Sequence, residues 1–389
     1  MRADTDEYAR RGASWVGTQA LTISGETPLE IAVWYPAANA AGPEETTTYP
    51  YTLKMGDPLG KVTIASYTGQ AIPGGAYDLS HGPYPLVILS PGFAIGSSAY
   101  AWLAEHLASH GLVVISPDHA EHLDPENELW RATVTRPQDV LTVLAFVDEQ
   151  AGPGGQLEGL VTSDRVAVIG HSYGGYTALA AGGAQLDTQA FADQCEAAYQ
   201  AGEPNPFLCD MLQPHWADMA ALAGLNAVPT GRWPVWADSR IDAVVSIAGD
   251  AVMFGPAGLA GVNVPVLAIG GTADDDSPYE WGTSPAYQNT TGPRKVRIGL
   301  EGAGHMLFTG PCEPVRWYLK PLSAEFCSDA GWDRGYAHDL VRHFTTAFLL
   351  AELKHDPAAA AGLAPERVSF TGVTYNAQGY TGDGNGQGF

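Results

Sequence analysis

A serine set between glycines is the strongest chemical signal in the sequence. Residues 170–174 read Gly-His-Ser-Tyr-Gly. They follow an apolar run at 166–169 that indicates a buried strand and precede small apolar residues that indicate a helix. A serine at such a strand–turn–helix junction has a strained backbone that needs small neighbours, and its hydroxyl projects above the sheet. Ser172 is therefore the candidate nucleophile.

A serine hydroxyl is a weak nucleophile and needs a general base. For a serine in this setting, the order along the chain is serine, acid, histidine. His305 follows an expected strand at 295–298 and is the candidate base. Asp274, which follows an expected strand at 266–269, is the favoured acid. Asp250 follows an earlier strand, would reach the same rim of the sheet, and stays open as the alternative.

Acyl transfer also needs two backbone N–H donors for the oxyanion that forms. Tyr173, directly after the nucleophile, supplies one candidate. The loop after the strand at 86–90 supplies the other, and we assign it to Phe93, whose ring is also expected to contact substrate. His119 and His122 follow another buried strand and are expected to line the site, with His119 as a substrate-binding candidate.

The elements that must position these residues alternate along the chain. The sequence predicts strands at 86–90, 112–115, 166–169, 243–247, 266–269 and 295–298, after two earlier ones at 15–18 and 29–35. It predicts helices at 98–109, 138–149, after Ser172 and at 338–353, and an irregular excursion over 37–82. Continuous apolar strands alternating with helices predict a doubly wound α/β fold, with a mostly parallel sheet covered on both faces.

One domain over residues 1–375 is the expected organisation. Residues 183–240 interrupt the alternation of strands and helices and are rich in large apolar side chains, so they are interpreted as an inserted cap or lid. Residues 376–389 are rich in Gly and Asn and are expected to form a flexible C-terminal tail.

Four cysteines fall into two local pairs, which favours the disulfides Cys195–Cys209 and Cys312–Cys327. Three connectivities are possible, and four buried free thiols are the alternative. Disulfides need an oxidising compartment, so a secreted or periplasmic protein is expected. The polar N-terminus shows no apolar signal segment, which leaves a cytoplasmic protein or, as we favour, a mature form with an added Met.

The charge balance is strongly acidic, with 19 Lys+Arg against 43 Asp+Glu and a net charge of −24. Such a field repels nucleic acid and anionic lipid surfaces and favours a neutral or cationic substrate. No apolar run approaches the roughly 18 residues that a membrane-spanning helix needs. The expected partner is a small or polymeric substrate, and the expected state is a monomer or a small homo-oligomer.

Several segments together resemble two related groups of bacterial enzymes. Ser-Pro-Gly-Phe at 90–93 and Leu-Ala-Ser-His-Gly-Leu-Val-Val at 107–114 look like bacterial cutinases and polyester (PET) hydrolases. With Val-Trp-Tyr-Pro at 33–36 and the glycine-rich 170–175, they also look like bacterial platelet-activating-factor acetylhydrolase-like proteins, often labelled dienelactone hydrolases. The resemblance covers most of residues 15–370. It implies an α/β-hydrolase fold and cleavage of carboxylic esters without a metal or organic cofactor.

The implied function is that of a serine carboxylic ester hydrolase with an acyl-enzyme intermediate, extending to synthetic polyesters. A phospholipase or lipase of the acetylhydrolase kind is the alternative, and an amidase or a non-catalytic binding protein are weaker ones. The chain departs from a typical cutinase by the insert at 183–240, which would narrow access, and by Tyr173, where many have Met. Asp250 matches the acid position of some acetylhydrolases.

Overall fold

A ten-stranded sheet forms the centre of the computed structural model, which describes residues 7–39, 46–202, 208–311, 326–327 and 331–382. The strand order across the described sheet is β12-β11-β10-β9-β8-β6-β7-β2-β1-β5. The strands are β1 (Trp15–Ile23), β2 (Leu29–Ala37), β5 (Ile72–Pro73), β6 (Tyr84–Ser90), β7 (Val113–Pro117), β8 (Val161–His171), β9 (Ile241–Ile247), β10 (Val266–Gly271), β11 (Lys295–Leu300) and β12 (Val373–Gln378).

The six central strands, β6 to β11, run parallel to one another. The strands β1, β2 and β12 pair antiparallel at the two sides. The central strands are apolar on both faces because helices cover both. The predicted α/β fold with a mostly parallel sheet is therefore confirmed.

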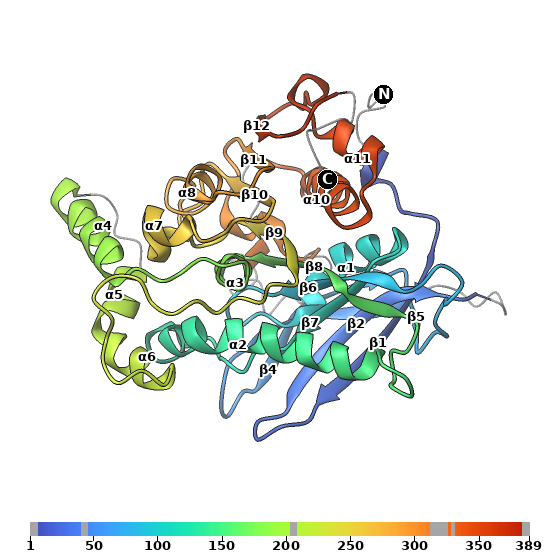
Figure 1. Cartoon of the computed structure of the whole chain (residues 1–389), viewed down its shortest axis with the longest axis horizontal. Coiled ribbons are helices and arrows are strands. Elements are labelled where there is room, and N and C mark those ends of the chain that lie inside the picture. The colour runs from blue at the N-terminus through green and yellow to red at the C-terminus, as the bar shows by residue number, and fades with distance from the viewer. Residues whose placement is uncertain (1–6, 40–45, 203–207, 312–325, 328–330, 383–389) are drawn as a thin grey trace.

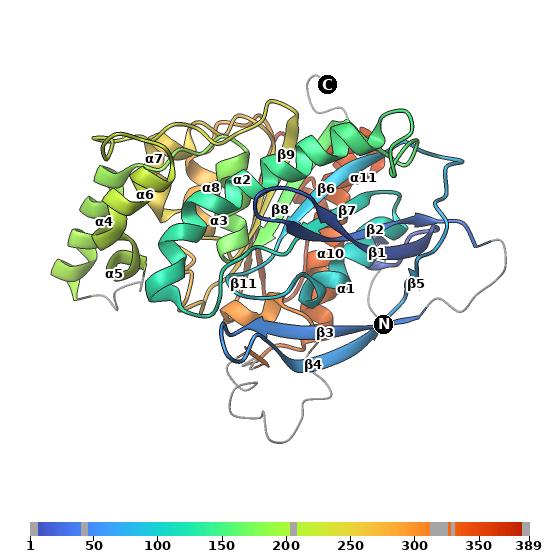
Figure 2. The ribbon, with the colours of Figure 1, turned by 90° about the horizontal axis from the view of Figure 1, so that it is seen from below.

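Helices cover the sheet in two layers (Figures 1 and 2). The helices α2 (Pro125–Ala151), α3 (Tyr173–Ala181) and α8 (Thr283–Asn289) pack on one face, and α1 (Ala101–Ser109) and α10 (Arg334–Lys354) pack on the other. Successive residues of β6 divide between the two cores. Leu86 and Ile88 join the α2 and α3 side, and Val87 and Leu89 join the α1 and α10 side.

The irregular excursion expected over 37–82 is wrong over much of its length. Here β3 (Thr47–Lys54) and β4 (Lys61–Gly69) form a separate antiparallel pair. Tyr49, Tyr51 and Leu53 alternate with more exposed residues and are buried in the core beneath α1. This alternation is the two-residue period of a strand. The proline within it made the segment resemble irregular structure in the sequence.

The helix expected from 138 instead begins at Pro125 and passes through Pro137. A proline inside a helix has no N–H to offer the carbonyl four residues earlier, which here belongs to Thr133. The buried hydroxyl of Tyr176 donates to that carbonyl at 2.8 Å. Because another element replaces the missing donor, the helix continues and its N-terminal half reaches the carboxyl end of the sheet.

The described part of the insert forms three α-helices, α4 (Thr188–Ala201), α5 (Leu208–Leu212) and α6 (Trp216–Leu222), at one end of the molecule (Figure 1). They pack against α2 and the short turn of helix at 252–254. A disulfide between Cys195 and Cys209 joins α4 to α5. The other expected bridge lies outside the described residues, because Cys312 does. No described helix is long and apolar enough to cross a membrane.

The C-terminal tail does not begin where the sequence suggested. Residues 376–378 belong to β12 and pair antiparallel with β11. Tyr380 is buried, and its hydroxyl donates to the carboxylate of Glu352 at 2.7 Å. The expected boundary at 376 therefore falls inside an edge strand, held by backbone hydrogen bonds.

Candidate active site

Ser172 lies in the turn between β8 and α3, with φ 57° and ψ −126°. This left-handed φ is rare for a residue with a side chain and marks a strained turn. A Cβ placed on Gly170 would lie 2.2 Å from the carbonyl oxygen of Gly174, and one placed on Gly174 would lie 2.0 Å from that of Ser90. Both contacts are with backbone, which cannot move aside cheaply. The two glycines are therefore what allows the turn to close.

The side chain of His305 is paired with that of Asp274. The imidazole Nδ1 and the carboxylate Oδ2 are 2.8 Å apart, and both residues are buried. The other carboxylate oxygen, Oδ1, accepts the backbone N–H groups of Asp276 at 3.0 Å and Ser277 at 2.8 Å. The carboxylate is thus fixed on one side and orients the imidazole on the other, which leaves Nε2 to exchange a proton.

The surroundings of His305 favour its charged form. Burial alone would lower the pKa of the imidazole, but the charge and hydrogen bond of Asp274, together with the charges of Asp276 and Asp250, outweigh burial and raise it to about 9. A general base must be neutral to accept a proton. The fraction of His305 able to act as base therefore grows as pH rises towards this value.

Asp250, the alternative acid, has a different partner. Its Oδ1 accepts the hydroxyl of Ser277 at 2.7 Å, and burial raises the pKa of this carboxyl to about 7. The structure thus gives His305 a hydrogen bond to Asp274, while Asp250 lies in the same pocket with its own hydroxyl donor.

A second hydrogen-bonded chain links the serine turn to the histidine loop. His171 Nε2 lies 3.1 Å from the carbonyl oxygen of His305, and its Nδ1 lies 2.8 Å from the Tyr100 hydroxyl. A carbonyl only accepts, so Nε2 carries the hydrogen. Burial holds the pKa of His171 well below its usual value, so Nδ1 is unprotonated and accepts from Tyr100. The Tyr100 oxygen in turn accepts the N–H of Gly92 at 3.0 Å.

Four of the predicted site residues line one pocket of about 160 Å³: Ser172, His305, Phe93 and Tyr173. Within the described residues, no hydrogen bond joins Ser172 to His305. Catalytic hydrogen bonds often tighten only when substrate is bound. The remaining wall is largely apolar and consists of Ile95, Leu123, Pro125, Leu129, Met306 and Phe326, with Asp250, Asp276 and Ser277.

The described part of the insert does not line this pocket. Of its described residues, which are 183–202 and 208–240, none lines the pocket. The wall on that side comes from the N-terminal end of α2 and the residues just before it. The insert packs on α2 from outside, with Trp130 stacked on His215 at 5.3 Å between ring centroids. Its described part is therefore placed to brace α2.

The two predicted oxyanion donors are available. The backbone N–H groups of Phe93 and Tyr173 donate to no other atom among the described residues. Tyr173 is the first residue of α3, where the helix dipole favours negative charge. The two side-chain rings meet edge to face, with centroids 6.2 Å apart, and form one wall of the pocket.

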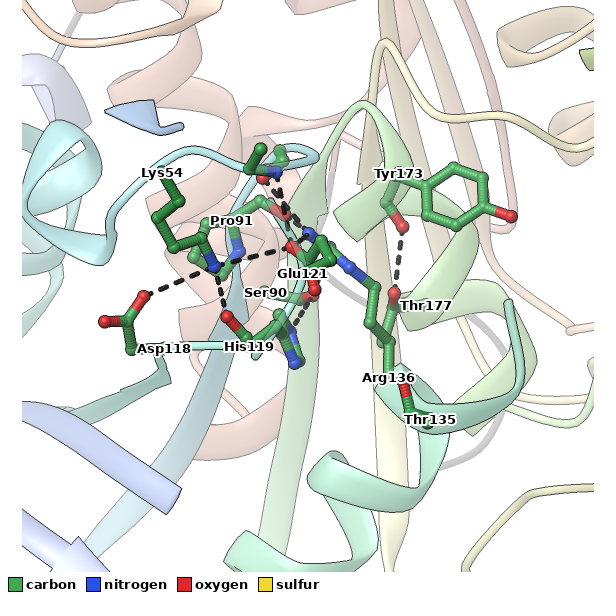
Figure 3. Close-up of polar contacts among 12 residues, drawn as sticks. Lys54, Ser90, Pro91, Asp118, His119, Glu121, Thr135, Arg136, Tyr173 and Thr177 are labelled. Carbon is green, nitrogen blue, oxygen red and sulfur yellow. Dashed lines mark hydrogen bonds and ion pairs between the residues drawn. The ribbon is translucent and has the colours of Figure 1, made fainter. Parts of the chain in front are cut away.

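The predicted substrate contact by His119 is wrong. This side chain is 1% exposed and does not line the pocket. Its Nε2 lies 2.9 Å from Ser90 Oγ (Figure 3). Its Nδ1 lies 2.6 Å from Asp139 Oδ2. These three side chains repeat the order of a catalytic triad, but Ser90 is fully buried and no substrate reaches it. His122 is not among the lining residues either.

Sequence reasoning missed the contribution of α2 to the site. Asp124 followed by Pro125 and an acidic first turn is a helix-start signal that places Leu129 on the opening turns of this helix. The buried cation Arg136, from the same helix, had no such signal. Two of its hydrogen bonds are made to residues more than forty positions earlier in the chain, which no local pattern predicts.

The fold and the site together define a class of protein. The chain belongs to the alpha/beta hydrolase family, whose model matches residues 86–316. It is 30% identical to a cutinase of Thermobifida fusca over 176 residues, which are 43% of this chain and 52% of the cutinase. It is 33% identical to a bis(hydroxyethyl) terephthalate hydrolase of Streptomyces coelicolor over 111 residues, which are 28% of this chain and 32% of that enzyme. The matches thus span about half or less of each relative's length.

Proposed function

We propose that this protein is a serine carboxylic ester hydrolase that works through an acyl-enzyme intermediate. The observation that carries the proposal is the 2.8 Å pairing of His305 with Asp274 at a pocket that also contains Ser172 in its strained turn. A nucleophile, a base and a group that orients the base are the parts that acyl transfer by serine needs.

The reaction has two halves. His305 Nε2 takes the proton of Ser172 as Oγ attacks the ester carbonyl carbon, and the N–H groups of Phe93 and Tyr173 stabilise the oxyanion. As the tetrahedral intermediate collapses, His305 gives its proton to the departing alcohol. Water then enters and loses a proton to His305 as it attacks the acyl carbon. His305 returns that proton to Ser172 Oγ as the bond between Oγ and the acyl carbon breaks and the acid leaves. Asp274 stays ionised and stabilises the imidazolium in both halves.

The pocket narrows the class of substrate. An apolar cavity of about 160 Å³ suits a short or medium acyl chain or a single aromatic ring. The similarity to cutinases and to a bis(hydroxyethyl) terephthalate hydrolase supports esters of an aromatic acid, including polyester chains. The insert, whose described part contributes nothing to the lining, is compatible with such extended substrates.

The proposed place of action is an oxidising compartment outside the cytoplasm. The disulfide between Cys195 and Cys209 supports this, because disulfides persist mainly in secreted and periplasmic proteins.

The test is a panel of p-nitrophenyl esters from acetate to palmitate, with bis(hydroxyethyl) terephthalate and an amorphous PET film, assayed with wild type and Ser172→Ala. The expected result is chain-length-dependent hydrolysis that falls about 10⁴-fold or more in the variant. Ser163→Ala is the matched control, because Ser163 lies in β8, the strand that leads to Ser172, and its hydroxyl hydrogen-bonds Asp148 on the surface. Activity that survives in Ser172→Ala, or a folded wild type inert towards every ester, would refute the proposal.

A further inference from the structure

A buried arginine holds the loop that carries Phe93. Arg136, from α2, is fully buried. One of its terminal nitrogens, Nη1, donates to the carbonyl of Pro91 at 2.7 Å, and the other, Nη2, donates to the carbonyl of Gly92 at 3.1 Å (Figure 3). The planar fork of a guanidinium donates from two nitrogens held apart in a fixed geometry, whereas an ammonium group donates from a single nitrogen. The two carbonyls just before Phe93 are thus held by a single side chain.

A buried carboxylate holds the same loop from the other side of Phe93. Glu121 Oε1 accepts from Arg136 Nη2 at 2.5 Å and from the backbone N–H of Ala94 at 3.3 Å. Ala94 has φ 56°, a left-handed conformation that a residue with a side chain keeps only when its surroundings impose it. Lys54 lies 3.5 Å from the same oxygen of Glu121. The loop is therefore clamped at residues 91, 92 and 94.

This clamp sets the direction of the Phe93 amide. The peptide between Gly92 and Phe93 is trans, and in a trans peptide the C=O and the N–H point in opposite directions. Since the Gly92 carbonyl faces Arg136, the Phe93 N–H faces away from Arg136, and Phe93 itself lines the pocket. We infer that Arg136 and Glu121 are positioning residues, which aim the Phe93 N–H at the substrate oxyanion without touching substrate themselves.

The role is one of orientation rather than net charge. The buried cations Arg136 and Lys54 are matched by Glu121 and by Asp118, which lies 3.4 Å from the Lys54 ammonium and also pairs with the exposed Lys61. A cluster without excess charge offers little direct attraction to an oxyanion. What it supplies is a fixed amide in a site that does not need to reorganise as the charge develops.

The inference rests on the proposed ester hydrolase, and Arg136→Lys tests it. Lysine keeps the charge but has a single nitrogen, so it cannot reproduce the fixed two-nitrogen geometry with which Arg136 holds the Pro91 and Gly92 carbonyls. We expect kcat for p-nitrophenyl butyrate to fall by about tenfold to a hundredfold, because the hydrogen bond from the Phe93 N–H to the oxyanion forms in the transition state. We expect KM to change less than about twofold. The inhibition constant of a trifluoromethyl ketone, which forms a tetrahedral oxyanion adduct on serine, should rise in parallel with the loss of kcat/KM.

A second variant and a control separate positioning from stability. Glu121→Gln keeps an acceptor for the Ala94 N–H but removes the charge that pairs with Arg136, and a smaller fall in kcat is expected. If Arg136→Lys does not fold, the kcat of Glu121→Gln tests the inference in its place. Arg294→Lys disrupts another part-buried ion pair, which joins the residue just before β11 to Glu352 of α10. It should lower Tm without changing kcat. Arg136 and Glu121 variants that lose Tm but keep the wild-type kcat and inhibition constant would overturn the inference.

Labelling with a fluorophosphonate separates a failure of the proposed ester hydrolysis from a failure of the role inferred for Arg136. The reagent reports a reactive serine whatever the substrate. If wild type is labelled at Ser172 but hydrolyses no ester, the proposed function fails. The labelling rate of Arg136→Lys against wild type then decides the inference, with a fall of at least about tenfold expected. An equal rate, or a wild type that is not labelled, would overturn it.

Discussion

Two buried carboxylates close to His305 have different hydrogen-bond partners. Asp274 bonds the imidazole directly, whereas Asp250 accepts a hydroxyl from Ser277. Only the first arrangement holds the ring of His305 through Nδ1 and leaves Nε2 to exchange a proton. The second adds negative charge nearby once Asp250 ionises, and burial raises the pKa of Asp250 to about 7.

This difference predicts how pH profiles respond to each carboxylate. Because the pKa of His305 is raised to about 9, kcat/KM should fall as pH drops below that value. Asp274→Asn removes the largest stabilising charge, so the acidic limb should move to lower pH while kcat falls by about 10⁴. Asp250→Asn should move the limb less and keep most of kcat. Profiles from pH 5 to 10 with a soluble ester check both, and the reverse pattern would make Asp250 the acid.

At the scale of elements, α2 connects the site to the rest of the domain. Its first turns line the pocket, Arg136 clamps the Phe93 loop, and the insert packs on its outer side. The helix nevertheless contains Pro137, and it stays continuous because the Tyr176 hydroxyl serves the carbonyl of Thr133.

A double-mutant cycle tests this explanation of α2. Tyr176→Phe should lower the free energy of unfolding by about 1–3 kcal/mol, because it leaves the buried Thr133 carbonyl without its side-chain donor. In a Pro137→Ala background the restored N–H can serve that carbonyl, so the same change should cost much less. Urea unfolding of the four proteins measures the coupling. Equal costs in both backgrounds would show that the two residues act independently.

The insert should act as a brace for α2 and not as a gate for the pocket. The double variant Cys195→Ser/Cys209→Ser removes a bridge with a sequence separation of 14 residues and should lower stability by about 3 kcal/mol. Activity on soluble esters below the unfolding temperature should hardly change, since the described insert does not line the pocket. Thermal unfolding and initial rates check the two parts. A large change in KM that depends on chain length would restore the lid interpretation.

At the scale of the whole molecule, the net charge of −24 should govern which surfaces the protein approaches. Repulsion from an anionic surface acts over a screening length of about 30 Å at 0.01 M salt and about 8 Å at 0.15 M. Hydrolysis of an ester carried in anionic vesicles should therefore increase as salt is raised, while hydrolysis in neutral vesicles changes little. Faster hydrolysis in anionic than in neutral vesicles at low salt would show that a local basic surface overrides the net charge.

The parts of the molecule predictable from sequence were those encoded by neighbouring residues. Ser172 lies between Gly170 and Gly174, and His305 and Asp274 each follow an apolar strand. The structure brings these residues to the same edge of the sheet. The role of Arg136 and the burial of His119 depend on contacts between distant segments, which no local pattern records.

The errors in predicting helices and strands from the sequence also have physical causes. Pro137 is typical of a helix boundary. The Thr133 carbonyl that it leaves without a backbone donor instead accepts the hydroxyl of Tyr176, which is distant in the sequence. The two strands over 47–69 pair with each other apart from the main sheet, and their buried residues are interrupted by polar ones. The apolar insert has the composition of a lid, but composition does not say which surface it covers.

The most direct test of the central claim is to trap the acyl group on the protein. Wild type is quenched in acid during turnover of p-nitrophenyl butyrate, digested and examined by peptide mass spectrometry. Our account predicts a butyryl adduct on Ser172 that is absent from Ser172→Ala. Product release with the acyl group on another residue would contradict it, as would full turnover by the Ser172→Ala protein.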